Sequence, residues 1–219
     1  MIGCSALADE RVSLEPLALG HVPALVAAAS RDRSTFDLAP VPTDEASTRA
    51  YVEAALADAE AHRAVPFAVR RRRSDAIVGS IRFMSFEWWS WPRGPIAVPG
   101  EPRRAADGDP PDVVEIGHAW LARDAQHTEV FPAACALMMR HAFEVWRVHR
   151  LVLKTDARNE RSRAAIVRLG ATFEGVLRKH LPAADGIVRD TAMFSVIQAE
   201  WPIVATGLAS RLAAERSAS

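Results

Sequence analysis

The hydrophobic pattern of this chain switches repeatedly between a period of two, typical of half-buried strands, and a period near 3.6, typical of amphipathic helices. The segments read as strands are 12–17, 66–70, 76–86, 113–122, 149–154, 173–180 and 187–197. The segments with helical spacing are 21–30, 43–62, 132–146, 159–169 and 202–215. This order predicts an α/β (α+β) fold with a mixed sheet and a strand–helix–strand crossover.

Residues 153–178 hold the densest set of local signals. The predicted strand ends at Thr155 and Asp156, Asn159 stands where a helix N-cap is preferred, and Gly170 follows the helix where a left-handed cap is needed. A helix N-terminus just past a strand end presents unpaired N–H groups and the positive end of the helix dipole. The geometry therefore suits an anionic or amide-rich ligand.

Two further helix starts follow from single residues. Thr43 is the expected N-cap of the helix over 43–62, because acidic residues follow it in the first turn. Pro132 is expected at the first position of the helix over 132–146, since its fixed φ suits that position.

The stretch over 87–112 is rich in Pro and Gly and predicts a long loop rather than regular structure. Trp88, Trp89 and Trp91 lie in it. We interpret it as a flap over a pocket or a subunit interface, and tryptophans that merely cover the sheet are the alternative. If the flap lines a pocket, these rings can stack on an aromatic or cationic acceptor.

Composition indicates a chain that buries one sizeable core. About half of the 219 residues are hydrophobic, and 27 basic residues balance 27 acidic ones, so overall charge favours neither a nucleic-acid partner nor a membrane surface. No apolar run is long enough to span a bilayer and the N-terminus lacks a signal pattern, which predicts a cytoplasmic protein. Cys4 and Cys135 are too few for a thiolate metal site, and Cys135 is expected in the core.

Four consecutive arginines, Arg70–Arg73, stand at the predicted hairpin turn. We interpret them as a solvated hairpin tip. A grip on a phosphate is the alternative.

The order of several short motifs resembles one known family. The stretch LKTDARNERSRAAIVRLGATFEGVLRKH, with Asn159 and Ser162 in an N-x-x-S pattern, resembles the GNAT N-acetyltransferases of the ribosomal-protein alanine acetyltransferase type (RimJ/RimL-like). The flanking matches are LEPL at 14–17, VEIGHAWL at 114–121 and RDTAMFSVIQAEWP at 189–202. The resemblance covers nearly the whole chain. It implies a single domain over 1–219 with a mostly antiparallel, twisted sheet, splayed at the cofactor site and covered by helices on both faces.

The resemblance also implies direct transfer of acetyl from acetyl-CoA to a primary amine. Such an amine must lose a proton, because its pKa is about 8 for an α-amine and about 10.4 for Lys. Glu115 is the first candidate base, with a structural acid as the alternative, and His118 is the second. Ser162 is the candidate proton donor to the departing thiolate, with a plain helix-surface serine as the alternative. Tyr51, the chain's only tyrosine, lies too far upstream for the tyrosine donor of many relatives.

The resemblance places the cofactor along the strand end, the following loop and the helix at 159. The implied contacts are Leu121, Ala122, Gln126, His127, Thr128, Glu129, Val130, Phe131, Asn159 and Ser162. The family's loop motif is R/Q-x-x-G-x-G/A, and here Gln126 fits while Glu129 and Phe131 replace small residues. A carboxylate beside a pyrophosphate is repulsive unless it points away, so this departure predicts weakened binding.

Two functions remain open at this point. The first is an N-acetyltransferase acting on a protein N-terminus or a small-molecule amine, and the second is a catalytically impaired GNAT-fold protein that binds CoA or regulates. No metal is implied, and a homodimer is plausible from the apolar flap and last helix. The acceptor pocket is expected between the early helices (21–62) and the flap.

Overall fold

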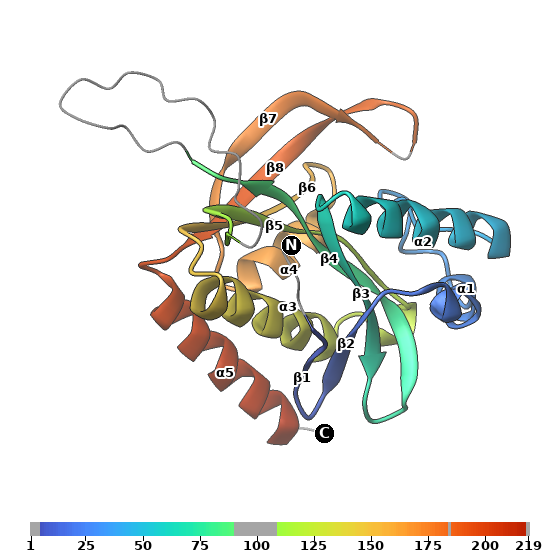
Figure 1. Cartoon of the computed structure of the whole chain (residues 1–219), viewed down its shortest axis with the longest axis horizontal. Helices are drawn as coiled ribbons and strands as arrows, with labels where there is room; N and C mark the ends of the chain where they lie inside the picture. The colour runs from blue at the N-terminus through green and yellow to red at the C-terminus, as the bar shows by residue number, and fades with distance from the viewer. Residues whose placement is uncertain (1–4, 90–108, 184, 218–219) are drawn as a thin grey trace.

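The strands form one sheet of eight in the order β1-β2-β3-β4-β5-β6-β8-β7 (Figure 1). The computed structural model describes residues 5–89, 109–183 and 185–217, and the side chains only to residue 214. The strands are β1 (Leu7–Ala8), β2 (Val12–Pro16), β3 (Ala64–Arg71), β4 (Ala76–Glu87), β5 (Val113–Leu121), β6 (Arg150–Asp156), β7 (Thr172–Pro182) and β8 (Val188–Ile197). The α-helices are α1 (Val22–Ser30), α2 (Glu45–Glu60), α3 (Val130–Arg140), α4 (Glu160–Arg168) and α5 (Trp201–Ser217).

The sheet is antiparallel except between β5 and β6, which run parallel. Their pairing spans only three residue pairs, from Val113 with Arg150 to Glu115 with Val152. Beyond Glu115 the two strands diverge, and the sheet forks between them. The mixed, mostly antiparallel and splayed sheet predicted from the sequence is confirmed.

Helices cover both faces of the sheet, as predicted (Figure 1). On one face α3 and α5 pack over a core that includes Phe83, Met138 and Phe194, each at most 1% exposed. On the other face α1 and α2 enclose a second cluster around Leu25 and Val52. Cys135 is fully buried in the first core, as expected. The assignment of 1–219 to a single domain stays a prediction.

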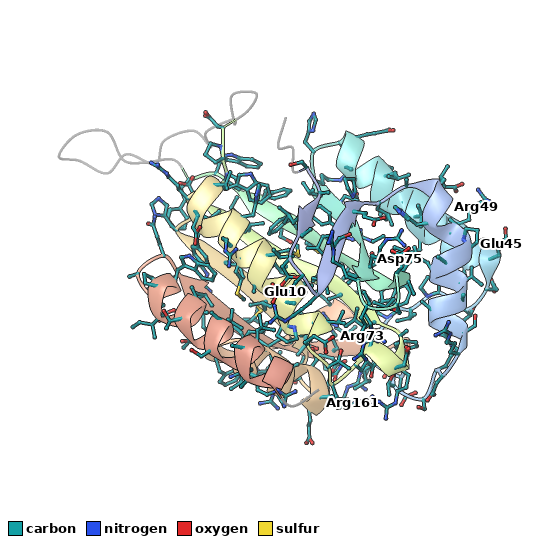
Figure 2. All side chains as sticks on the ribbon, turned by 90° about the horizontal axis from the view of Figure 1, so that it is seen from below. Glu10, Glu45, Arg49, Arg73, Asp75 and Arg161 are labelled. Carbon is teal, nitrogen blue, oxygen red and sulfur yellow. The ribbon has the colours of Figure 1, made fainter. Side chains whose placement is uncertain are left out.

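The N-cap of α2 is Asp44, so the prediction of Thr43 was wrong. Asp44 has extended backbone and its carboxylate accepts from the Ser47 amide, while the Ser47 hydroxyl lies 3.1 Å from the Asp44 amide that donates to it. A carboxylate interacts more favourably with the positive end of the helix dipole than a hydroxyl does, which explains why Asp44 rather than Thr43 is the N-cap. Further along, Glu45 and Arg49 form an exposed ion pair on α2 (Figure 2).

The helix predicted at Pro132 begins two residues earlier, at Val130, so Pro132 occupies the third position rather than the first. Proline is tolerated there because the amides of the first turn have no intrahelical partner. The α-helix ends at Arg140, and a wider π-type turn over His141–Val145 replaces the regular helix predicted through Trp146.

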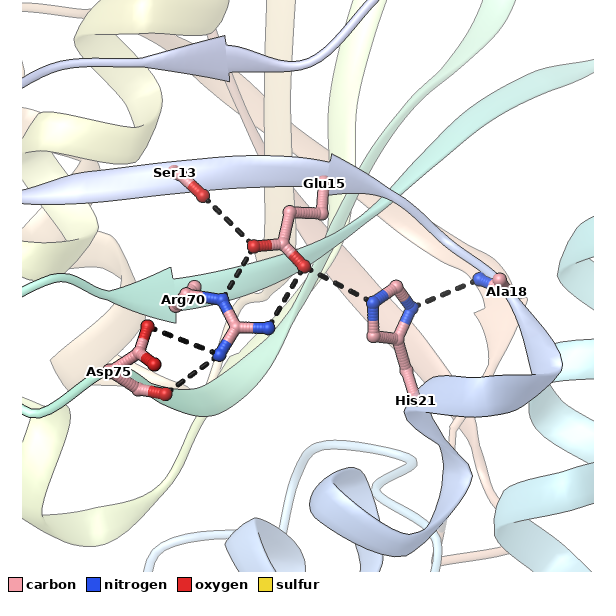
Figure 3. Close-up of polar contacts among 6 residues, drawn as sticks. All are labelled: Ser13, Glu15, Ala18, His21, Arg70 and Asp75. Atoms are coloured by element: carbon pink, nitrogen blue, oxygen red, sulfur yellow. Dashed lines mark hydrogen bonds and ion pairs between the residues drawn. The ribbon is translucent and has the colours of Figure 1, made fainter.

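The arginines predicted at the hairpin tip divide between the sheet and solvent. Arg70 and Arg71 belong to β3, and Arg71 is 5% exposed and donates to the Asp124 carbonyl at 2.7 Å. Only Arg72 and Arg73 lie exposed at the turn. Arg70 pairs with Glu15 of β2, whose carboxylate also contacts Ser13 and His21 (Figure 3).

Glu15 is expected to stabilise the fold above its normal titration range. The hydrogen bonds from Arg70 lower the pKa of Glu15 from 4.5 to about 2. A carboxyl with a lowered pKa contributes stability above about pH 4.5, and this contribution is lost as pH falls toward 2. Its side chain is 29% exposed, so we expect Glu15→Gln to reduce the free energy of unfolding at pH 7 by roughly 1–2 kcal/mol.

Urea denaturation of both proteins at pH 7 and pH 3 measures this effect. The difference between wild type and Glu15→Gln should shrink at pH 3, because the wild-type carboxyl is then mostly protonated in the unfolded chain. Glu10→Gln is the matched control, since Glu10 is 63% exposed. An equal loss of stability at both pH values would contradict the electrostatic explanation.

Candidate active site

A cavity of about 370 Å³ opens where β5 and β6 diverge. The end of β5, the loop before α3, one side of α4 along its length, the 31–41 loop and Arg211 of α5 contribute to its walls. Past Glu115, the β6-facing edge of β5 has no strand partner in the described part of the chain. Backbone polar groups on such an edge need other partners, so this edge is suited to bind an extended, amide-containing ligand.

Asn159 caps α4 as predicted. Its side-chain oxygen accepts from the Ser162 amide at 3.0 Å. Both side chains line the cavity, and the Ser162 hydroxyl has no hydrogen-bond partner among the described residues. The cap therefore uses the backbone of Ser162 and leaves its hydroxyl available to a ligand.

Gln126 connects the end of β5 to the 31–41 loop, which lines the cavity. Its side-chain amide donates to the Leu121 carbonyl at 2.9 Å and to the Thr35 hydroxyl at 2.8 Å. Arg161 of α4 donates to the Thr35 carbonyl at 3.1 Å. Ala122, predicted to contact the cofactor, instead uses its amide on Val78 and does not line the cavity. Thr35 thus contacts both the segment that follows β5 and the helix α4 that follows β6.

The loop before α3 presents several free amides. Thr128 donates its hydroxyl to the Ala125 carbonyl and accepts from the Val130 amide, which holds the turn. Within the described chain, the amides of His127, Thr128, Glu129 and Phe131 donate to no protein acceptor. Consecutive free N–H groups at a helix N-terminus form an anion-binding nest.

The two residues that depart from the family's loop motif, Glu129 and Phe131, differ in their position relative to the cavity. Glu129 has an ordinary right-handed backbone and does not line the cavity. The left-handed residue is His127, with φ of 58°. Phe131 does line the cavity and also packs against the core, whereas Val130 is fully buried.

The cavity is strongly cationic. Three guanidinium groups, those of Arg161, Arg168 and Arg211, line it together with His127, and none of the described residues in its lining carries a carboxylate. Cations enclosed with low-dielectric walls raise the local concentration of anions. A ligand that carries several phosphates fits this charge distribution.

Glu115 lies at the fork itself and is 3% exposed. One carboxylate oxygen, Oε2, accepts from the Ser85 hydroxyl at 2.7 Å and pairs with the Lys154 ammonium at 2.8 Å. The other, Oε1, has no hydrogen-bond donor in the described chain and faces Gly117, where an added Cβ would come within 2.8 Å. Gly117 thus leaves one carboxylate oxygen open.

A β-bulge interrupts the regular pleat of β5 at His118. A regular pleat would place His118 and Glu115 on opposite faces of the strand, and the bulge removes that constraint. His118 has φ of 47°, and the pairing with β4 slips between Ser80 and Arg82. A bulge of this kind re-aims a side chain. Burial first, and then the charge of Arg82, lower the pKa of His118, so at neutral pH it is uncharged and able to accept a proton.

The remaining aromatic candidates lie outside the fork. The Tyr51 hydroxyl donates to Ser80 under α2, so it offers no proton there. Trp88 lines a second cavity beside β4. Trp89 stacks on His149 with ring centroids 5.5 Å apart. Trp91 lies outside the described residues.

Sequence reasoning missed Thr35, Ser85, Lys154, Arg168 and Arg211. Lys154 sits within the most informative stretch, but only the pairing of β5 with β6 brings it to Glu115. Across residues 5–89, 109–183 and 185–217, no cluster of His, Cys, Asp or Glu is arranged to hold a metal ion. None of the helices described there has the length and apolar character of a membrane span.

The forked sheet, the amide nest and the cationic cavity form a site suited to a phosphate-bearing, amide-containing ligand, and comparison with known proteins identifies the family. A family model described as an acetyltransferase (GNAT) domain matches residues 11–172. The chain belongs to the GNAT acetyltransferase family, as the sequence motifs predicted.

Individual relatives agree with this assignment. The provisionally named ribosomal N-acetyltransferase YdaF of Bacillus subtilis is 32% identical over 87 residues, which span 40% of this chain and 46% of YdaF. A provisionally assigned acetyltransferase of T. thermophilus is 31% identical, with a TM-score of 0.76 over 97% of this chain and 99% of its own. Mycobacterium smegmatis RimJ, solved with CoA-disulfide, is 20% identical with a TM-score of 0.70 over 94% of each chain, a likeness of fold.

Proposed function

We propose that the protein is an acetyl-CoA-dependent N-acetyltransferase that acts on a primary amine. The observation that carries this proposal is the cavity at the fork, whose described lining has guanidinium groups without a carboxylate and which opens beside a nest of free amides. CoA combines phosphates with an amide-containing arm, and these are the two chemistries that the cavity and the β5 edge accommodate.

Different parts of the cavity bind different parts of acetyl-CoA. The amides of the loop from His127 to Phe131 hold the pyrophosphate, and Arg161, Arg168 and Arg211 provide positive charge for the phosphates. The end of β5 at Leu121 binds the amide-containing arm. Ala122 supports this edge from behind, because its side chain is buried and it does not reach the cavity.

Groups at the fork accept the proton of the acceptor amine. Acetyl-CoA supplies the acetyl group as a thioester, and the products are an N-acetyl amine and a free thiol. Glu115 takes the amine proton on its open Oε1, with Ser85 and Lys154 fixing the carboxylate through Oε2. His118, uncharged and close enough to Glu115 to interact with it electrostatically, is the second group able to accept that proton.

Ser162 donates a proton to the departing sulfur. Its hydroxyl faces the cavity from the first turn of α4, where the helix dipole also favours developing negative charge. The acceptor is a protein N-terminus or a small-molecule amine, and the relation to YdaF favours a ribosomal protein. The cytoplasmic location and the homodimer stay predictions.

A thermal-shift titration with acetyl-CoA tests donor binding. Ligand at about 100 times its Kd should add about 2.7 kcal/mol, which raises Tm by roughly 5–10 °C for a chain of this size. Arg168→Gln and Arg211→Gln should each need more ligand for the same shift, whereas Arg73→Gln, at the exposed hairpin tip (Figure 2), should not. No shift at millimolar acetyl-CoA would contradict the proposal.

Thiol release with a panel of primary amines then separates the enzyme from the alternative, a CoA-binding protein without turnover. Amine-dependent release of CoA supports the transferase. A full thermal shift without release from any amine supports the alternative instead.

A further inference from the structure

A second cavity, of about 460 Å³, lies beside β4 under the C-terminal half of α2. Its lining comprises Asp58, His62, Arg63, Ala64, Arg82, Met84, Ser85, Phe86 and Trp88. Its lining combines residues at the end of α2 with Trp88, and both belong to regions expected to form the acceptor pocket. Ser85 connects it to the fork, because its hydroxyl donates to Glu115.

Arg82 is the unusual group in this cavity. Its side chain is only 5% exposed, yet its guanidinium makes no hydrogen bond to the described part of the chain, and its Nε is buried without a partner. It rests over the Tyr51 ring at 5.2 Å and lies 3.6 Å from Asp58. Buried charges are normally paired and hydrogen-bonded, so this guanidinium retains unused donors.

Asp58 pairs with Arg82 through Oδ2, but the distance of 3.6 Å is too long for a hydrogen bond. Its Oδ1 already accepts from the Nε and Nη2 of Arg63, at 3.1 and 2.9 Å. Two guanidinium groups therefore share one carboxylate, which leaves the cavity with a net positive charge. Glu115 does not neutralise it, since Lys154 pairs with that carboxylate.

We propose that this cavity binds the acceptor and that the acceptor carries a carboxylate, held by Arg82, a few bonds from its reacting amine. The inference rests on the proposed N-acetyltransferase function. Arg82 stands directly opposite Gly117, two residues from Glu115. Side chains related in this diagonal way lie about 7–8 Å apart at their bases, a span that one amino-acid residue bridges between its amine and an acidic group.

The same cations assist the reaction. An ammonium group beside Arg82 and Lys154 is destabilised by like charge, which lowers the pKa of the acceptor amine and favours its neutral, nucleophilic form. The carboxylate compensates in binding for the repulsion that the amine experiences. Neutral and basic acceptors lack this compensation and bind more weakly.

Matched acceptors test the proposal. C-terminally amidated peptides beginning with Asp or Glu are compared with those beginning with Asn or Gln, and free amino acids are compared with their amides. Wild type should prefer the acidic member by at least about tenfold in kcat/KM. Preference among the peptides assigns the carboxylate to a side chain, and preference among free amino acids assigns it to the α-carboxylate.

Variants locate the preference. Arg82→Gln should abolish it, Arg82→Lys should retain part of it, and Asp58→Asn should increase it by removing the competing carboxylate. The Asp58 variant keeps the test decisive if the Arg82 variants fold poorly. Equal use of acidic and neutral acceptors by wild type, or a preference unchanged in a folded Arg82→Gln protein, would overturn the inference.

A binding measurement separates this inference from the proposed function. Calorimetry with N-acetylated peptides beginning with Asp or Asn, in the presence of CoA, needs no turnover. Turnover without charge preference rejects only the acceptor assignment. Absence of turnover together with selective binding of the acidic peptide rejects the transferase and retains the carboxylate site.

Discussion

Glu115→Gln is expected to lower kcat/KM for the acceptor amine by roughly 10²- to 10⁴-fold, the usual contribution of a general base. The substitution preserves shape and the contact with Ser85 but removes the group that accepts the proton. The deficit should shrink above about pH 8 for an α-amine acceptor, because solvent then deprotonates the amine. A Lys-type amine, with its higher pKa, should show the deficit over the whole range.

Two controls distinguish a base from a structural acid. Lys154→Met breaks the same ion pair while leaving the carboxylate in place, so a structural role predicts equal losses for both variants. A base predicts a much larger loss for Glu115→Gln. If Glu115→Gln retains activity and His118→Gln loses it, the imidazole is the base and the assignment of Glu115 is wrong.

Local signals in the sequence predicted most of the elements. The Asn159 cap and the left-handed Gly170 after α4 follow from the preferences of single residues, and the structure contains both. The errors at α2 and α3 also have local causes. Asp44 competes successfully with its neighbour Thr43, and Thr128 shapes a helix start two residues before Pro132.

The arrangement of the site depends on contacts that no local pattern encodes. Thr35 reaches Gln126 across 91 positions of sequence, and Ser85 reaches Glu115 across 30. The bulge at His118 breaks the period-two rule, so the alternation of residues in the sequence does not give the direction of that side chain. Motif resemblance supplied candidate residues, but only the pairing of β4, β5 and β6 shows which of them meet.

For Glu129, too, the local sequence and the folded structure lead to different expectations. In sequence, a carboxylate within the expected pyrophosphate loop predicts repulsion, whereas the folded loop places Glu129 outside the cavity lining. Because the nest consists of backbone amides, it depends on backbone conformation more than on which side chains follow. The left-handed conformation falls on His127, a residue that tolerates it better than a β-branched one.

Ser162→Ala is expected to reduce kcat by roughly 10²-fold or more, with little change in stability. The cap of α4 uses the Ser162 amide, which alanine retains, so the variant removes only the hydroxyl that faces the cavity. Asn159→Ala is the complementary variant, since it keeps the hydroxyl and loses the cap, at a cost of about 1 kcal/mol in unfolding free energy. Stopped-flow thiol release and urea denaturation of both proteins measure the two effects separately. Full turnover by Ser162→Ala would exclude it as the proton donor and leave water to protonate the departing thiolate, a feasible route because a cysteine-type thiol has a pKa of about 8.5.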